Sequence, residues 1–201
     1  MQQSGSVRET QIRETEVKFA VHSASGFQER LRALGFEILH ERVFERNTIL
    51  DMAPLYLRPQ GCLLRLREAG GKTTITFKGK ASVSRVKSRE EIEYIASDAS
   101  SAFRVFAGMG YHPTFVYEKY RTEYAKPGQA GIVTLDETPI GTYAELEGDE
   151  DWIDETAQAL GFGEVDYITA SYGALYLKWC EEQALAPEHM RFDSTRAAVS
   201  K

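Results

Sequence analysis

Pairs of like-charged residues separated by one position recur along this 201-residue chain. Glu14 and Glu16 form an acidic pair, and Arg65 and Arg67 form a basic one. Further pairs are Lys119 with Arg121 and Glu145 with Glu147. Arginine holds phosphate oxygens with a planar, two-pronged donor and lysine holds them as a compact charge, whereas carboxylate oxygens suit hard divalent cations. The pairs therefore point to chemistry on a polyanion bound together with a divalent metal.

The spacing of these pairs is the side-chain period of a β-strand, in which successive residues point to opposite faces. In the first such segment Glu14, Glu16 and Lys18 share one face, while Val17 and Phe19 take the other. Eight segments alternate in this way, at about 13–20, 42–50, 62–69, 72–80, 88–95, 115–125, 131–137 and 142–148. Seven of the eight carry a charged face. Its remaining members are Arg65, Arg67, Lys78, Lys80, Arg89, Glu91, Glu93, Lys119, Arg121, Glu123, Asp136, Glu145 and Glu147.

Helical periodicity appears between the strand segments, and a Gly follows three of the four expected helices. The helices are expected at about 23–35, 102–110, 151–161 and 171–184. Residues 81–87 predict a mobile basic loop, from which Arg85 and Lys87 either close over a substrate or stay solvated. Residues 1–11 and 187–201 predict flexible tails around a single folded domain at 12–185.

Two architectures fit this pattern. An antiparallel sheet could expose its polar face to water, but such faces usually hold Thr, Ser and Gln, and here nearly all the positions are ionised. The alternative is an α+β fold, in which helices cover the outside of a closed, eight-stranded antiparallel β-barrel with a charged lumen. Such a barrel has room for side chains or one small ligand. Because Glu and Lys are rarely buried without a partner or an ion, we expect this lumen to bind a metal and a polyanion.

Composition limits the class of protein. Hydrophobic residues make up 42 % of the chain and charged residues 27 %, as in ordinary globular proteins. The net charge of −6 argues against nonspecific nucleic-acid binding, and no apolar run reaches the ~20 residues of a membrane span. The first residues lack the apolar stretch of a secretory signal, and the only cysteines are Cys62 and Cys180, so we expect a cytoplasmic protein. A homodimer is the default expectation for its assembly.

The order of the charged motifs resembles the CYTH family, also called triphosphate tunnel metalloenzymes. The family hallmark, E-x-E-x-K, is matched by Glu14, Glu16 and Lys18. It is followed in order by LRLRE, TFKGK, SREEIE, EKYR, LDE and YAELEG. The resemblance covers roughly 12–180 and is nearest to the class IV adenylate-cyclase-like branch. One departure is Ile49, which stands where many relatives carry a tyrosine that in some triphosphatases helps a lysine to activate water.

The resemblance implies a role for each matched residue. Metal binding, with Mg²⁺ or Mn²⁺ as the cofactor, falls to Glu14, Glu16, Asp136, Glu145 and Glu147, chiefly to the last two. Substrate binding falls to Arg65, Arg67, Lys80, Arg89, Lys119 and Arg121. Because cations confined together lower each other's pKa, Lys18 or Lys78 is expected to act as a general base.

The reaction depends on which phosphorus meets the nucleophile. Attack of the ribose 3′-oxygen on the α-phosphorus of ATP gives cyclic AMP and pyrophosphate, as in a class IV adenylate cyclase, and this is the favoured hypothesis. Attack of water on the γ-phosphorus makes the protein a nucleoside, organic or inorganic triphosphatase. Two further alternatives are a non-catalytic triphosphate-binding module and a polar-faced sheet protein with a protein partner.

Overall fold

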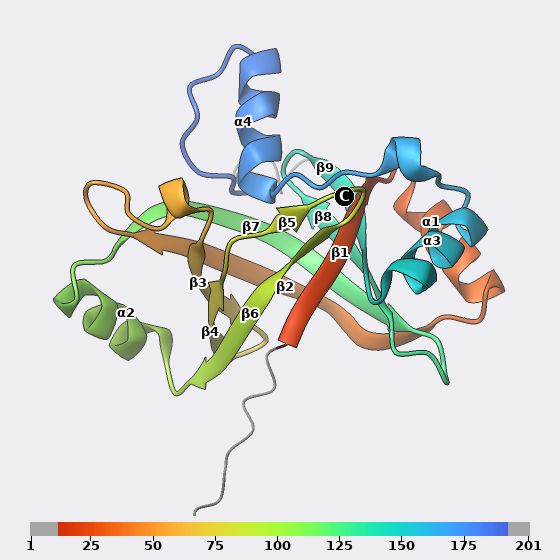
Figure 1. Ribbon diagram of the computed structural model, residues 1–201, viewed down its shortest axis with the longest axis horizontal. Helices are drawn as coiled ribbons and strands as arrows, with labels where there is room; N and C mark the ends of the chain where they lie inside the picture. Colours follow the sequence, from red (N-terminus) through yellow and green to blue (C-terminus); the bar gives the residue numbers. More distant parts are fainter. Residues whose placement is uncertain (1–11, 193–201) are drawn as a thin grey trace, which may run out of the picture.

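The computed structural model describes residues 12–192, in which eight antiparallel strands close into a barrel (Figure 1). Their order around the ring is β1-β9-β8-β7-β2-β3-β4-β6, and β6 pairs again with β1. The ring strands are β1 (Ile12–Ala20), β2 (Glu37–Asp51), β3 (Leu63–Ala69), β4 (Lys72–Lys78), β6 (Lys87–Ala96), β7 (His112–Ala125), β8 (Ile132–Thr138) and β9 (Gly141–Glu147). A short ninth strand, β5 (Ser82–Val83), pairs with β6. The predicted α+β fold with a closed eight-stranded barrel is confirmed.

Alternation along each strand separates the lumen from the core. Val17 and Phe19 on β1 are buried against the helices outside, while Lys18 points the other way, toward its cross-strand partner Glu145 on β9. The four α-helices are α1 (Ala24–Ala33), α2 (Ala99–Gly108), α3 (Glu150–Ala159) and α4 (Tyr172–Glu182). Two short 3₁₀ helices, η1 (Arg58–Gln60) and η2 (Glu164–Asp166), lie in the connections.

The helices cover the barrel in three places (Figure 1). One core lies beneath α1 and α3, and a second lies beneath α2 against β3 and β4. A third lies beneath α4, which stands over one end of the barrel. Each α-helix starts at a side-chain cap, as at Ser171, whose hydroxyl accepts a hydrogen bond from the Ala174 N–H at 3.2 Å. No helix among the described residues has the length and apolar character needed to cross a bilayer.

The C-terminal segment corrects one expectation. Residues 187–192 were expected in a flexible tail, but they form a strap along β7: the Met190 N–H donates to the Val116 carbonyl at 3.0 Å, and the Glu118 N–H donates to the Met190 carbonyl at 2.8 Å. Pairing of β8 with β7 extends no further than Tyr120, so the strap takes the backbone groups that β8 leaves open. Met190 is fully buried. The expected tails at 1–11 and 193–201 lie outside the described residues, and the domain bounds of 12–185 stay a prediction.

The basic loop at 81–87 also differs from expectation. Lys87 is buried and opens β6, with its ammonium 2.6 Å from the Glu16 carboxylate. Arg85 is half-buried and pairs with Glu150 and Asp154 on α3. In this structure the loop is therefore tied to both the lumen and a helix.

Candidate functional site

The barrel encloses a cavity of about 660 Å³. Its charged part, here called the tunnel, is lined by Glu14, Glu16, Lys18, Arg65, Arg67, Lys78, Lys87, Arg89, Lys119, Arg121 and Glu145. Ten of these eleven are residues that the sequence assigned to the site. Of the other three assigned residues, Asp136 is fully buried behind Lys119 and Arg121, and Glu147 is exposed at the end of β9. The third, Lys80, is exposed beyond the end of β4, and the structure does not bring it to the tunnel.

The inner cluster consists of Lys18, Lys119, Arg121, Asp136 and Glu145. Asp136 accepts hydrogen bonds from Lys119 at 2.8 Å and from Arg121 at 2.7 and 2.6 Å. Glu145 contacts both Arg121 and Lys18. Burial opposes ionisation of Glu145, but Lys18 and Arg121 outweigh it and hold the pKa of Glu145 well below its ordinary value. These side chains therefore form a buried, internally compensated ion-pair network.

Lys18 behaves differently from the expected general base. Burial disfavours its ammonium, but the carboxylates of Glu145 and Glu16 outweigh that effect, so the pKa of Lys18 is raised. We expected neighbouring cations to lower the pKa of Lys18, and this direction is wrong. The second expected base, Lys78, lies 2.8 Å from Glu14 and 2.6 Å from Glu91.

The acidic rim is a second group, made of Glu14, Glu16, Glu91 and Glu147. Glu16 and Glu147 lie opposite each other on β1 and β9. Although Glu147 is exposed, loss of hydration beside the barrel and the neighbouring carboxylates of Glu14 and Glu16 raise the pKa of Glu147 to about 7. Glu14 is affected in the same way. Burial and the nearby Glu91 raise the pKa of Glu14 above its ordinary value, although Lys78 acts to lower it. Lys78 pairs with Glu14 and Glu91, and Lys87 pairs with Glu16. Glu147 is therefore the rim carboxylate that is short of positive charge.

Glu45 on β2 pairs with two tunnel residues from behind the cavity wall, and the sequence analysis missed it. Its carboxylate lies 3.5 Å from Arg67 and 3.6 Å from Lys119. Burial alone would raise its pKa, but Lys119 and Arg67 lower the pKa of Glu45 to about 2. The sequence contained a signal for this residue, because Glu45 and Asn47 are two positions apart and so share one face of β2. Asn47 also accepts a hydrogen bond from Arg67 at 3.2 Å.

Tyr172 enters the site from outside the barrel. Its hydroxyl donates to Asp136 at 2.6 Å, and its ring lies under the Lys18 ammonium, 4.3 Å from the ring centroid. Burial, together with the Asp136 and Glu145 charges, raises the pKa of Tyr172 well above its ordinary value. The sequence marked Ser171 correctly as a helix cap, but no local pattern shows that the next residue reaches into a barrel.

Tyr117 on β7 was also missed. It shares the inward face with Phe115, Lys119 and Arg121, so strand alternation alone places it in the cavity. The side chain is only 8 % exposed, and the Arg65 guanidinium faces its hydroxyl. Tyr117 therefore lies between the charged tunnel and the apolar end of the cavity.

The apolar end, here called the vestibule, lies between the barrel and α4. Its apolar lining residues are Ile49, Leu50, Leu55, Leu57, Leu63, Phe115 and Leu177, and Arg58 and Glu188 also border the cavity. Asp51 fixes the loop that carries two of these leucines, because its carboxylate accepts hydrogen bonds of 2.8–3.0 Å from four backbone N–H groups between Met52 and Arg58. Ile49, the position of the family departure, thus forms part of an apolar wall.

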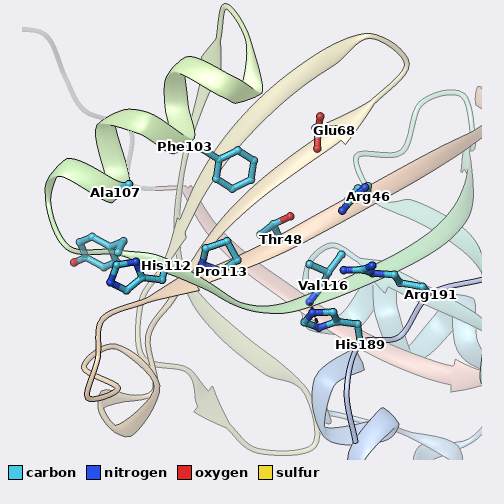
Figure 2. A pocket seen from close by; sticks show the side chains of 11 residues that line it. Arg46, Thr48, Glu68, Phe103, Ala107, His112, Pro113, Val116, His189 and Arg191 are labelled. Carbon is cyan, nitrogen blue, oxygen red and sulfur yellow. Dashed lines mark hydrogen bonds between the residues drawn. The ribbon is translucent and has the colours of Figure 1, made fainter.

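A second cavity of about 420 Å³ lies outside the barrel (Figure 2). Its floor is formed by Thr48, Pro113 and Val116, with Phe103 of α2 on one side and Arg191 of the strap on another (Figure 2). None of the residues that the sequence assigned to the site lines it. The tunnel therefore remains the candidate site.

The donor set of the tunnel suits a hard divalent ion, because carboxylates supply its acidic oxygens. Among the described residues, however, no group of three or more His, Cys, Asp or Glu side chains is already arranged to hold an ion. Asp136 and Glu145 are engaged by cationic side chains, whereas Glu147 at the rim has no ion pair within the described part of the chain. A metal could therefore bind Glu147 without displacing a cation, whereas the inner cluster must first exchange partners.

Comparisons with known proteins agree with this geometry. The sequence profile of the CYTH domain matches residues 13–172. A Methanocaldococcus jannaschii protein, provisionally named an adenylate cyclase, is 26 % identical over 134 residues, which cover 67 % of this chain and 75 % of that protein.

Solved structures share the fold. A protein from Vibrio parahaemolyticus, also provisionally named an adenylate cyclase, has a TM-score of 0.70 at 23 % identity, covering 79 % of this chain and 94 % of that one. The adenylyl cyclase homologue HpAC1 from Hippeastrum, described as having a dominant triphosphatase activity, has a TM-score of 0.58 at 18 % identity, covering 87 % and 97 %.

Proposed function

Because the chain belongs to the CYTH domain family, we propose that its tunnel binds a nucleoside triphosphate with Mg²⁺ or Mn²⁺ and catalyses the adenylate cyclase reaction. In this reaction the 3′-oxygen of ATP bonds to the α-phosphorus, the bond from that phosphorus to the bridging oxygen breaks, and pyrophosphate leaves with the electron pair. The products are cyclic AMP and pyrophosphate.

The observation that carries this proposal is a tunnel of paired charges that opens into an apolar vestibule. Buried ions need partners, and the cations of the tunnel are paired with carboxylates. A triphosphate with its metal brings both signs of charge. Its phosphates can take over the cations and its metal can take over the carboxylates, so the exchange leaves few buried charges unpaired.

The tunnel residues divide into two groups in this proposal. The phosphates would be held by Arg65, Arg67, Arg89, Lys119 and Arg121, with Lys18 and Lys78 beside them. The metal ligands would come from Glu14, Glu16, Asp136, Glu145 and Glu147. When bound, the ion would neutralise phosphate charge and stabilise charge that develops on the leaving group. The vestibule would hold the nucleoside, since an apolar wall suits a base and offers inorganic triphosphate nothing.

A triphosphatase is the second candidate. The activity described for the Hippeastrum relative favours it, and the tunnel cations could stabilise water attack on a γ-phosphorus equally well. The two reactions release different products from the same substrate, so one measurement separates them.

Phosphorus NMR of the products is the test. The protein is incubated with ATP, and separately with inorganic triphosphate, each with Mg²⁺ or Mn²⁺. We expect cyclic AMP and pyrophosphate from ATP, and no turnover without metal. ADP with free phosphate would replace the cyclase by the triphosphatase, and metal-dependent binding without any product would leave only a binding module.

Two lysines on β4 provide a matched control. Lys78 lies in the tunnel, while Lys72 is exposed at the opposite end of the same strand. Lys78→Met should reduce turnover at least 100-fold, as expected when a positioned charge is removed from a phosphoryl-transfer site. Lys72→Met should leave turnover within twofold of the parent, and equal losses in both variants would refute the assignment of the tunnel.

A further inference from the structure

We propose that Tyr117 is the catalytic residue that accepts the proton of the attacking ribose hydroxyl. This inference rests on the proposed function and adds to it the group that activates the nucleophile. It follows from the place of Tyr117 in the cavity, the way its ring is held, and the charges that face its hydroxyl.

The place of Tyr117 is fixed by strand alternation. From the vestibule toward the tunnel, the inward side chains of β7 are Phe115, Tyr117, Lys119 and Arg121. A nucleoside triphosphate with its base in the vestibule and its terminal phosphates beside Lys119 and Arg121 must pass Tyr117 at the junction. The ribose and the α-phosphate lie at that junction, and they carry both atoms that react.

The ring is held on several sides. Its centroid is 5.9 Å from that of Phe115 and 6.0 Å from that of Tyr172. The backbone of Tyr117 lies between β2, where Asn47 is its partner, and the strap, where Met190 bridges to it. A side chain fixed in this way can present its oxygen to a substrate without further ordering, and such positioning favours a catalytic role.

Cationic side chains dominate the surroundings of the hydroxyl. Arg65 and Arg67 face it from β3 and Lys119 faces it from β7. On the remaining sides lie Glu45 of β2, which is engaged with Arg67 and Lys119, and Tyr172 of α4, which donates to Asp136. Burial would raise the pKa of Tyr117, but Arg65, Lys119 and Arg67 outweigh it and lower the pKa below its ordinary value. The site therefore stabilises the phenolate, the form that a base requires, relative to a tyrosine in water.

Other basic groups of the inner cluster are already engaged. Lys18 is held as an ammonium by Glu145, and Asp136 accepts hydrogen bonds from Lys119, Arg121 and Tyr172. Glu147, whose ionisation is also displaced, lies at the end of β9 that is remote from the vestibule. Tyr117 thus combines a position beside the reacting atoms with a charge environment that stabilises the phenolate.

The step balances without a further reactant. The Tyr117 phenolate takes the 3′-hydroxyl proton as the 3′-oxygen bonds to the α-phosphorus. The bond from the α-phosphorus to its bridging oxygen breaks, and pyrophosphate departs with the electron pair. The Tyr117 phenol then returns its proton to solvent, and the site is ready for the next ATP.

The test compares two Tyr→Phe variants on one strand. Tyr117→Phe removes the proposed base, while Tyr124→Phe removes the hydroxyl of a buried tyrosine that packs in the core outside the barrel. Tyr117→Phe should lower kcat for cyclic AMP formation by about 100-fold or more. Its Kd for a non-reactive α,β-methylene analogue of ATP with Mg²⁺, measured by calorimetry, should stay within threefold of the parent. Tyr124→Phe should keep the parent kcat.

A second variant keeps the hydroxyl and changes its acidity. Replacing Tyr117 by 3-fluorotyrosine lowers the phenol pKa, and the acid limb of the kcat–pH profile should move to lower pH by a similar amount. A merely structural role would leave that limb in place. The inference is overturned if Tyr117→Phe keeps kcat within threefold, if the limb does not move, or if the only products are ADP and phosphate. In the first two cases cyclic AMP formation by the parent protein leaves the proposed function standing, whereas a parent protein without any product removes both.

Discussion

The inner cluster and the acidic rim both place carboxylates in one barrel, yet the charges around these carboxylates differ. In the inner cluster Asp136 and Glu145 each bind two cationic side chains. At the rim Glu147 instead has carboxylate neighbours, and its pKa is raised to about 7 by lost hydration and by Glu14 and Glu16. The difference teaches that acidic residues of one lumen can have separate roles. The inner ones are neutralised by cations of the protein itself, whereas Glu147 at the rim makes no ion pair within the described residues.

The largest expected effect comes from uncoupling the inner cluster. Asp136→Asn removes the charge that pairs with Lys119 and Arg121 and leaves buried cations short of a partner. We expect the free energy of unfolding to fall by about 3–5 kcal/mol, measured by urea denaturation at pH 7. The matched change at the rim, Glu147→Gln, should cause no loss. If both variants lose the same stability, the contrast between the two groups is wrong.

Acid should lower the free energy of unfolding by protonating Glu45. The folded-state pKa is about 2, because Lys119 and Arg67 outweigh burial, and it lies below the ordinary value of 4.5. A depressed pKa contributes stability that is fully present above pH 4.5 and is lost as the pH falls toward 2. The difference in unfolding free energy between the parent and Glu45→Gln should therefore shrink by up to about 3 kcal/mol over this window. A difference that is constant with pH would contradict the ion pairs of Glu45.

The vestibule should discriminate between substrates where the tunnel does not. Leu177 on α4 lines it and is 41 % exposed. Leu177→Asp should weaken metal-dependent ATP binding by about tenfold, which corresponds to ~1.4 kcal/mol. Binding of inorganic triphosphate should change by less than twofold, and calorimetry with both ligands checks this. Equal weakening of both would mean that Leu177 affects the tunnel rather than an organic group.

The smallest effect is expected at the rim. The pKa of Glu147 is raised, so the protonated side chain contributes stability that is fully present below pH 4.5. This contribution is lost as the pH rises through about 7 and Glu147 ionises. Glu147→Gln should raise the unfolding free energy at pH 8 by less than about 1 kcal/mol, because the residue is exposed and solvent screens its charge. The same variant should require more Mg²⁺ for half-maximal turnover. Lower stability at pH 8 would show that the rim is not short of positive charge.

Much of the barrel could be predicted because alternation is a local property. Each strand shows in its own sequence which residues share a face, so ten lumen residues were named before any pairing was known. The same rule was not carried through on β2 and β7, where Glu45 and Tyr117 lie on the inward face. Lys87 was assigned to a loop because the expected strand began at residue 88, whereas β6 begins at Lys87.

Other features depend on distant parts of the chain and leave no local signal. Tyr172 reaches Asp136 from a helix outside the barrel, and Met190 binds backbone groups that are free only because β8 ends early. The division of the carboxylates is also hidden in the sequence, since Glu145 and Glu147 are two residues apart on one strand. Only the cross-strand neighbours of each residue decide which one is neutralised.

The closure of the ring sets the order in which the molecule can be completed during translation. The first strand of the barrel, β1, pairs with β6 and with β9, so it emerges from the ribosome before both of its neighbours exist. Contacts between residues so distant in sequence close late and slow the folding of β-rich proteins. Until β9 is made, the nascent β1 segment exposes Glu14, Glu16 and Lys18 to water as well as its apolar face. The charges that later line the tunnel thus keep the earliest strand hydrated while it waits for its last partner.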